Sequence, residues 1–331
     1  PMGAASRWWL DKSLKSLAQE LEKLGNRLVF RKGVAAEVLD ALIAETGATC
    51  VVWNRLYDKT SIDRDAAIKA RLKDADVDVQ SFNAGLLNEP WTVQNGSGLP
   101  YKVFTPYWRA ARDHLNDVVV EAAPKVLRCL DKATSSDRLA DWGLHPTKPD
   151  WSKGFDIWTP GEAGARARLD AFLSGPIKGY GEKRDIPSAP ATSRLSPHLH
   201  FGEIGPRQVW IAARDAAEAD KFLSEIGWRE FNHSILFNWP HLPSRNFKPE
   251  FDGFPWAKDH AAFEAWTKGE TGYPIVDAGM RELWVTGFMH NRVRMIVASF
   301  LIKHLMIDWR EGEAWFWDTL VDADLANNVG N

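Results

Sequence analysis

Apolar side chains recur every three or four residues from Ser6 to Leu24, which is the spacing of one face of a helix. We therefore predict an amphipathic helix over this range. Ser6 would cap its first turn and Gly25 would end it, because serine accepts hydrogen bonds from free helix amides and glycine readily adopts the left-handed conformation that closes many helices.

Short apolar runs then alternate with helical patterns, which is typical of strands and helices in turn. We predict strands over Arg27–Arg31, Thr49–Trp53 and Val77–Phe82, the second of them buried, and helices over Val34–Ala44 and Asp63–Leu72. This alternation with short loops indicates a parallel sheet covered by helices. Domains of this kind normally open on a strand, so we expect the sequence to begin inside its domain, with at least one strand missing.

The pattern changes after residue 82. Residues 83 to about 105 carry turn residues, and Thr105 and Pro106 predict a helix with threonine as its cap and proline at its first position. Residues 134–162 lack periodicity, whereas the pattern from Gly164 onward is helical. The predicted fold is an incomplete N-terminal α/β domain with a parallel sheet (residues 1–90), a connector (residues 91–162) and an incomplete all-α C-terminal domain (residues 163–331).

Composition places the chain among ordinary globular proteins, since 45% of its 331 residues are apolar and 26% are charged. We expect no membrane span, because no apolar run approaches the roughly 20 residues that one needs. We also expect no signal peptide, since Pro1 leads directly into a helical pattern. Cys50 and Cys129 are far apart and lack metal-ligand spacing, which favours a reducing cytoplasm.

The net charge of −3 gives no global attraction to nucleic acid. Residues 176–331 carry 17 lysines and arginines against 21 aspartates and glutamates, so any DNA site must be a local basic patch. The chain also has 17 tryptophans and only 5 tyrosines. Most of these indoles are expected in the core, and a minority could stack on bases or relay electrons.

Hydroxyls and a guanidinium lie together in Thr192–Ser196, directly before Pro197. A serine cap followed by proline would start a helix there, and its free amides with Arg194 would bind phosphate. An exposed arginine beside a well-capped helix explains the same pattern. His198, His200 and Glu203 follow closely, but their spacing does not place the two histidines on one helical face, so we expect no metal and favour structural roles.

Four side chains suited to a flat ligand share one predicted helical face: Glu225, Trp228, Arg229 and Asn232. A tryptophan in a cavity would stack on the ligand, and Glu225 would hydrogen-bond its edge. A solvated surface with one half-buried tryptophan explains the pattern equally well.

Asn291, Arg292 and Arg294 crowd the first turn of a predicted helix that runs to about His304. The helix dipole disfavours cations there, so these arginines should meet phosphates or the carboxylates of Asp322 and Asp324. An internal salt-bridge network is the alternative. The segment from Asp322 to Asn328 lacks the ligands of a calcium loop, and its carboxylates suit ribose hydroxyls or arginine partners better.

With these motifs the sequence resembles the photolyase/cryptochrome family. The resemblance runs through most of the chain, in an ordered set of segments: Ala5–Leu10, Gly98–Pro106, Thr192–Glu203, Trp228–Phe231, Lys268–Met280, Met289–Arg292 and Asp308–Gly312. It implies an α/β domain that binds an antenna pigment, of folate or deazaflavin type, and a helical domain that holds FAD. Relative to the family, this sequence lacks the first strand and the C-terminal end of the flavin domain.

The resemblance also implies roles for particular residues. The positions that match FAD contacts are Tyr180, Thr192, Ser193, Arg194, Leu195, Ser196, Arg229, Arg294, Asp322, Ala323, Asp324 and Asn328. The positions that match contacts to DNA and lesion are Arg184, Glu225, Trp228, Asn232, Asn291 and Arg292. Trp256 and Trp309 match the outer and middle members of an electron-transfer chain. Glu225, Trp228 and Asn328 would act in catalysis, the last by facing the flavin.

The implied function is light-driven repair of cyclobutane pyrimidine dimers by electron transfer from excited, reduced FAD. The expected partner is UV-damaged DNA, and the expected protein is a cytoplasmic monomer. The alternative is a cryptochrome-type blue-light photoreceptor that binds FAD without repair; Trp228 and Asn328 are more similar to the repair enzymes. A further alternative is an inactive segment that binds little flavin.

Overall fold

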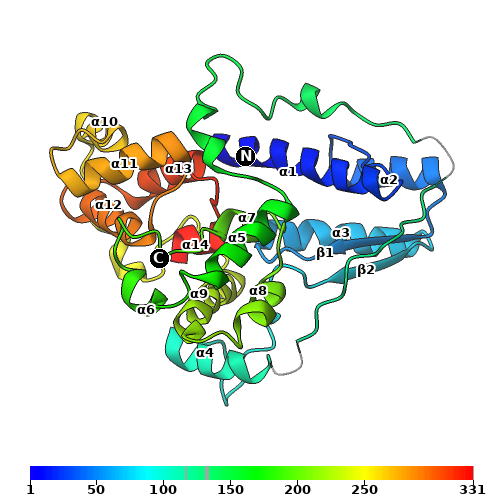
Figure 1. The fold of residues 1–331 in the computed structure, drawn as a ribbon, viewed down its shortest axis with the longest axis horizontal. Coiled ribbons are helices and arrows are strands. Elements are labelled where there is room, and N and C mark those ends of the chain that lie inside the picture. The colour runs from blue at the N-terminus through cyan, green and yellow to red at the C-terminus, as the bar shows by residue number, and fades with distance from the viewer. Residues whose placement is uncertain (116–117, 131–133, 331) are drawn as a thin grey trace.

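The computed structural model describes residues 1–115, 118–130 and 134–330, and it has a small α/β lobe beside a larger helical body (Figure 1). In the lobe, strands β1 (Cys50–Asn54) and β2 (Asp78–Phe82) pair in parallel, with Cys50 opposite Asp78. Helices α2 (Ala35–Thr46) and α3 (Lys59–Asp74) follow the predicted alternation.

One face of this sheet is covered and the other is open. Ile68 and Leu72 of α3 form a buried cluster with Val79 of β2, and α2 adds partly buried side chains to the same cluster. On the opposite face, Val52 is 60% exposed and Phe82 is 52% exposed. The prediction of a buried second strand is therefore wrong, because only alternate residues of β1 face helices.

The predicted strand over Arg27–Arg31 does not form among the described residues. This segment lies instead along residues 134–137, where the Asp137 amide donates to the Phe30 carbonyl at 2.8 Å. The other contacts are made largely by side chains, such as Ser136 Oγ, which accepts from the Phe30 amide at 2.9 Å. Arg27–Arg31 therefore contacts residues 134–137 but, among the described residues, forms no backbone hydrogen-bond ladder with a neighbouring strand.

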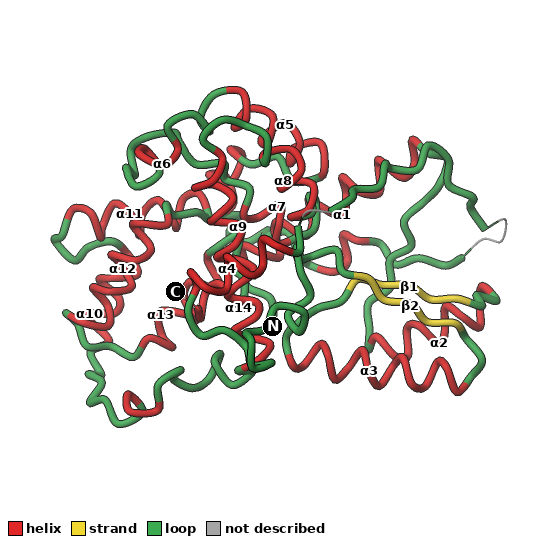
Figure 2. The backbone as a smooth tube through the Cα atoms, turned by 90° about the horizontal axis from the view of Figure 1, so that it is seen from below, coloured by secondary structure: helices red, strands yellow, loops and turns green. Residues whose placement is uncertain are grey.

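Helix α1 (Ala4–Lys23) connects the two parts of the molecule, beginning in the helical body and running toward the lobe (Figures 1 and 2). Its first turns are buried with Phe155, Trp158 and Phe288, and Trp9 is 0% exposed. The Ala4 amide donates to Asp318 at 2.8 Å, which places the start of α1 against helix α13 (Trp309–Thr319). Buried aromatic area therefore fixes α1 to the helical body.

Helix α4 (Phe104–Asp113) follows the loop after β2 and packs against helix α9 (Ala219–Asn238). It begins earlier than predicted, since Val103 is its N-cap and neither Thr105 nor Pro106 opens it. Close packing explains its position: a Cβ at Gly227 would lie 2.5 Å from Cε3 of Trp108, so only glycine lets the indole lie against α9. The connector then holds two short 3₁₀ turns, η1 (Leu139–Trp142) and η2 (Ser152–Ile157).

From residue 162 onward the described chain is helical, as predicted. The first group surrounds α9 and comprises α5 (Glu162–Ser174), α6 (Tyr180–Lys183), α7 (Ser196–His200) and α8 (Pro206–Ala213). After a 3₁₀ turn, η3 (Pro249–Phe251), come α10 (His260–Lys268), α11 (Pro274–Thr286), α12 (Asn291–Lys303) and α13. Each group has its own buried cluster. The last helix, α14 (Leu325–Gly330), lies between them and packs on α9 and α13 (Figure 1).

A buried carboxylate fixes the loop after β2 to the helical body. Glu230 of α9 is 1% exposed and accepts hydrogen bonds from the amides of Leu87 (2.7 Å) and Asn88 (3.2 Å). Arg229 and Arg207 donate to backbone carbonyls of the same loop, at 2.6 and 3.2 Å. Burial raises the pKa of Glu230 to about 7, although both arginines oppose the shift.

This raised pKa predicts a pH-dependent contribution to stability. The folded chain holds the Glu230 proton more tightly than the unfolded chain, so the associated stability is present below the ordinary value near 4.5 and is lost as pH rises through about 7. Relative to Glu230→Gln, the free energy of unfolding of the wild type should fall from pH 5 to pH 8 by up to about 3 kcal/mol. Urea titrations at each pH measure the difference. The exposed Glu264→Gln serves as control, and a difference that does not change with pH would contradict the prediction.

Candidate functional site

The centre of the site is the buried carboxylate of Asp322, in the segment before α14. Its Oδ2 accepts hydrogen bonds from Ser196 Oγ of α7 at 2.6 Å and from Arg294 Nη2 of α12 at 2.8 Å. Only 3% of the Asp322 side chain is exposed. Three predicted clusters that are distant in sequence therefore meet at one carboxylate. Ser196 is bonded to Asp322 and is not a cap, since Leu195 is the N-cap of α7, which is only five residues long.

Two arginines lie over one aromatic ring beside this carboxylate. The guanidinium carbons of Arg194 and Arg294 are each 5.2 Å from the centre of the Phe288 ring. Arg194 has a positive φ of 51°, a conformation that is uncommon for a residue other than glycine. Glu282 lies near both cations, and burial raises the pKa of its carboxyl. Guanidiniums bind phosphate oxygens through charged hydrogen bonds, so both arginines are candidate phosphate ligands.

A second carboxylate, Asp324, is half-buried and lies one turn before Asn328 on the edge of α14. Its Oδ1 accepts from the Asn327 amide (2.8 Å) and side chain (2.7 Å), and Asn327 in turn accepts from Asn232 of α9 at 3.0 Å. Its Oδ2 faces the ring nitrogens of His200 and His233 at 3.5 and 3.6 Å. Burial opposes ionisation of Asp324, but the protonated forms of His233 and His200, with the cation of Arg229, outweigh it and hold the pKa of Asp324 well below the ordinary value.

The rim of the site is a chain of ion pairs between α6, α9 and α12. Arg292 holds Asp185 through two hydrogen bonds of 2.7 and 3.0 Å, which lowers the pKa of that carboxyl. Arg184 is 7% exposed in its side chain and pairs with Glu225. Arg292 and Arg294 thus form ion pairs with Asp185 and Asp322, and Asp322 is one of the partners that the sequence predicted. Asn291 is exposed at the start of α12.

The four residues predicted to share a ligand-facing surface of α9 take different partners. Trp228 is 38% exposed, and one face of its indole stacks on Phe104 with ring centres 3.8 Å apart. Glu225 points to the rim, and Arg229 reaches the loop after β2. Asn232 is only 3% exposed and bonds Asn327, a burial that does not suit direct contact with DNA. Side chains on one helical face can extend toward different neighbours, and sequence spacing does not predict which neighbours they contact.

The remaining predicted residues lie at the edges of this region. Tyr180 is buried between Phe172 and Phe222, with the Arg184 guanidinium over its ring. Thr192 and Ser193 are half-buried, and Leu195 and Ala323 are fully buried beside the Asp322 contacts.

Trp256 and Trp309 are half-buried on segments that a backbone bridge between Ala257 and Ile307 brings together. Trp309 Nε1 donates to Asn246 at 2.9 Å, and the Trp256 ring packs on Phe254. The two indoles therefore lie on neighbouring segments of one part of the helical body, each with its own partner.

The donor set around Asp322 and Asp324 fits a flavin dinucleotide. Asp322 Oδ1 and Asn328 Nδ2 are buried and have no hydrogen-bond partner within the described ranges, so each can bind a ligand group. Carboxylates suit ribose hydroxyls, guanidiniums suit phosphates, and an amide suits the edge of a ring system.

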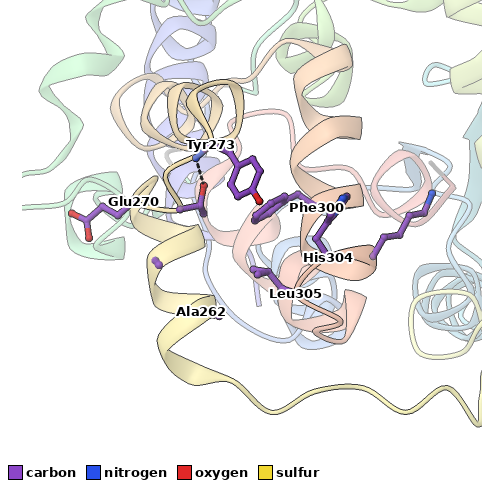
Figure 3. A pocket seen from close by; sticks show the side chains of 9 residues that line it. Ala262, Glu270, Tyr273, Phe300, His304 and Leu305 are labelled. Atoms are coloured by element: carbon purple, nitrogen blue, oxygen red, sulfur yellow. Dashed lines mark hydrogen bonds between the residues drawn. The ribbon is translucent and has the colours of Figure 1, made fainter.

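Two hollows described in the structure lie elsewhere. The larger, of about 550 Å³, is lined by Tyr273, Phe300 and His304 between α10, α11 and α12 (Figure 3). The smaller, of about 60 Å³, lies between the start of α1 and Trp284. Neither is lined by a predicted site residue.

The structural roles predicted for His198 and Glu203 are confirmed. Glu203 accepts from Trp9 Nε1 at 3.0 Å and from His198, so the pair joins α7 to α1. Among the described residues, no group of side chains could hold a metal ion, and no helix is long and apolar enough to span a membrane.

The sequence analysis did not identify Asp185, His233 or Phe288 as site residues, although each adjoins a motif that it did identify.

Comparison with known proteins identifies both parts of the chain. The sequence profile of DNA photolyase matches residues 1–126, and that of the FAD-binding domain of DNA photolyase matches residues 222–331. A deoxyribodipyrimidine photo-lyase of Agrobacterium fabrum is 53% identical, over 100% of this chain and 71% of that protein. Cryptochrome-2 of Arabidopsis thaliana is 40% identical, over 99% of this chain and 56% of that protein.

Solved structures confirm the predicted fold class. A bacterial class III photolyase from Agrobacterium tumefaciens is 53% identical with a TM-score of 0.96, and the match covers 100% of this chain and 70% of that one. An archaeal photolyase from Sulfolobus tokodaii, solved with two FAD molecules, is 29% identical with a TM-score of 0.80, over 100% of this chain and 71% of that one.

The Asp322 contacts predict a large cost for removing their cation. Arg294→Met leaves a buried carboxylate without its partner, and breaking such a pair typically costs about 3–5 kcal/mol. The free energy of unfolding, measured in urea, should fall by about this amount. Lys268→Met, which removes an exposed pair with Glu264, should change it by less than about 1 kcal/mol. Equal effects of the two substitutions would contradict the central role of Asp322.

Proposed function

Because the chain belongs to the photolyase/cryptochrome family, we propose that it is a lyase that repairs cyclobutane pyrimidine dimers in DNA by light-driven electron transfer from FAD. The observation that carries the proposal is 53% identity along the whole chain to a protein named deoxyribodipyrimidine photo-lyase. Cryptochromes are also similar, at 40% and 38% identity, and they make a photoreceptor without repair the second candidate.

In this proposal, residues around Asp322 and Asp324 hold FAD, which when bound supplies the photoexcited electron donor. Arg194 and Arg294 bind its phosphates, and Asp322 accepts hydrogen bonds from its hydroxyls through the unpartnered Oδ1. Asn328 directs its free amide to the ring system. Ser196 and Leu195 support this site from α7, with Tyr180, Thr192 and Ser193 beside it. Arg229 and Ala323 act indirectly, by fixing the backbone around the cofactor.

The rim would receive the lesion. A base that leaves the duplex must be unstacked and held between new partners. The exposed face of Trp228 offers such a surface, and its other face already stacks on Phe104, which keeps the indole fixed. Glu225 would hydrogen-bond the dimer, while Arg184, Arg292 and Asn291 would contact the DNA strand. Each of these arginines is already paired with a carboxylate, so binding exchanges one anion for another.

Other features of the proposal rest on the family resemblance. Trp256 and Trp309 would carry electrons to FAD from the surface, and a second, antenna chromophore would transfer light energy to it. The archaeal relative was described with a light-harvesting cofactor. We further infer a monomer in the cytoplasm, and two exposed, unpaired cysteines support the reducing compartment.

A repair assay under blue light tests the function directly. Glu225→Ala should lower the number of dimers repaired per absorbed photon by about tenfold or more, because a hydrogen bond to developing charge is worth at least this in enzymes. Repair is measured in an oligonucleotide with one dimer, and retained FAD is measured by absorption. The control is Glu264→Ala on α10. Bound FAD without repair in the wild type would favour the photoreceptor, and unchanged repair in the variant would remove Glu225 from the mechanism.

DNA binding by a local patch predicts marked salt dependence. Each phosphate contact adds about 0.9 to the slope of log affinity against log salt, so Arg292→Gln should reduce that slope by about one. Fluorescence anisotropy with dimer-containing DNA at several salt concentrations measures it. Arg71→Gln on α3 should leave the slope unchanged. An affinity that does not fall with salt would contradict the proposed interface.

A further inference from the structure

Asp324 lies between two imidazoles on different helices. His200 Nδ1 of α7 is 3.5 Å from its Oδ2, and His233 Nε2 of α9 is 3.6 Å from the same oxygen. The two histidines differ in access to solvent, since 25% of the His200 side chain and 13% of the His233 side chain are exposed. This cluster has no part in the proposed binding of FAD or DNA beyond Asp324 itself.

Hydrogen bonding fixes the tautomer of His233. Its Nδ1 lies 2.9 Å from the Arg229 carbonyl, which can only accept, so Nδ1 must carry the proton. The neutral ring then presents an unprotonated Nε2 to a carboxylate. Two acceptors facing each other gain nothing from this contact, whereas a proton on Nε2 would turn it into an ion pair.

Burial and the charges around His233 act on its pKa in opposite directions. Burial lowers the pKa of His233, Asp324 raises it, and the cation of Arg229 and the ring of His200 lower it again. Arg229 is bonded to the Gly85 carbonyl and lies 3.5 Å from Glu230, so its charge is partly compensated elsewhere. Asn327 and Asn232 complete the shell and carry no charge.

The cluster lies directly behind the residue proposed to face the flavin. The Asn328 amide donates to the Asp324 carbonyl at 2.8 Å, so the two residues are one helical turn, roughly 5 Å, apart along α14. A charge that appears at the flavin ring would therefore act on His233 through a short, poorly solvated path.

We propose that His233 is a positioning residue that takes up one proton from solvent at Nε2 when an electron enters the flavin site. The electron comes from an external reductant such as dithionite. The new imidazolium pairs with Asp324 and offsets the added negative charge. The inference rests on the proposed function, because it requires FAD against α14.

Redox titration of the FAD-loaded chain tests this proposal. With dithionite between pH 6 and pH 9, the midpoint potential of wild type should fall more steeply with pH than that of His233→Gln, by up to about 59 mV per pH unit for one extra proton per electron. His233→Gln cannot take up this proton and should keep only the slope that proton uptake by the flavin itself gives. His241→Gln, an exposed histidine with the same substitution, should keep the wild-type slope. An equal slope in wild type and His233→Gln would overturn the proposal.

Nuclear magnetic resonance of ¹⁵N-labelled histidine gives a second readout. Reduction of FAD should raise the pKa of His233, and Asp324→Asn should lower that pKa in both redox states. An unchanged His233 pKa on reduction would overturn the proposal while leaving the proposed function intact. Failure of the wild-type chain to hold FAD would overturn both.

Discussion

The helical body depends on a carboxylate that cannot remain buried alone. Desolvating Asp322 is unfavourable unless hydrogen bonds and an opposite charge compensate, and the chain provides both from α7 and α12. The three segments can therefore adopt only arrangements in which Ser196 and Arg294 reach the same oxygen. The guanidiniums of Arg194 and Arg294 beside Phe288, and the start of α14, lie next to this contact in the chain.

The site is layered around this contact. Asp322 lies in the buried layer, Asp324 lies beside it under α14, and the Arg184, Asp185, Glu225 and Arg292 network forms the rim. Charges in the buried layer have fixed partners, while Asp185, Glu225 and Arg292 on the rim are exposed enough to exchange theirs. Such an order suits a protein that keeps one ligand permanently and releases another.

Much of this architecture could be predicted from the sequence, because it depends on periodicity and on residue types. The helices, the two parallel strands and the contact of Arg294 with Asp322 belong to this group. The role expected for Asn328 comes from the family resemblance instead. What could not be predicted depends on three-dimensional neighbours. Arg27–Arg31 has the residue pattern of a strand but pairs with no strand among the described residues. Ser196 has the sequence position of a helix cap, but its hydroxyl donates to Asp322.

The same limit applies to single side chains. Asn232 has the spacing of a ligand-facing residue, yet α14 covers it. The contact between His233 and Asp324 could not be predicted, because the two residues are 91 positions apart in the chain. Family resemblance recovers positions that relatives share, but it does not describe contacts that belong to this chain.

The one-sided sheet has a consequence for how the molecule responds to heat. Its core is a small cluster around Ile68 and Val79, whereas α9 is enclosed by large apolar residues on several sides. A two-stranded sheet with one bare face is marginally stable by itself. The amides of β1 and β2 should thus exchange with deuterium by local opening well before those of α9, and the lobe can melt while the cofactor-binding helices stay folded.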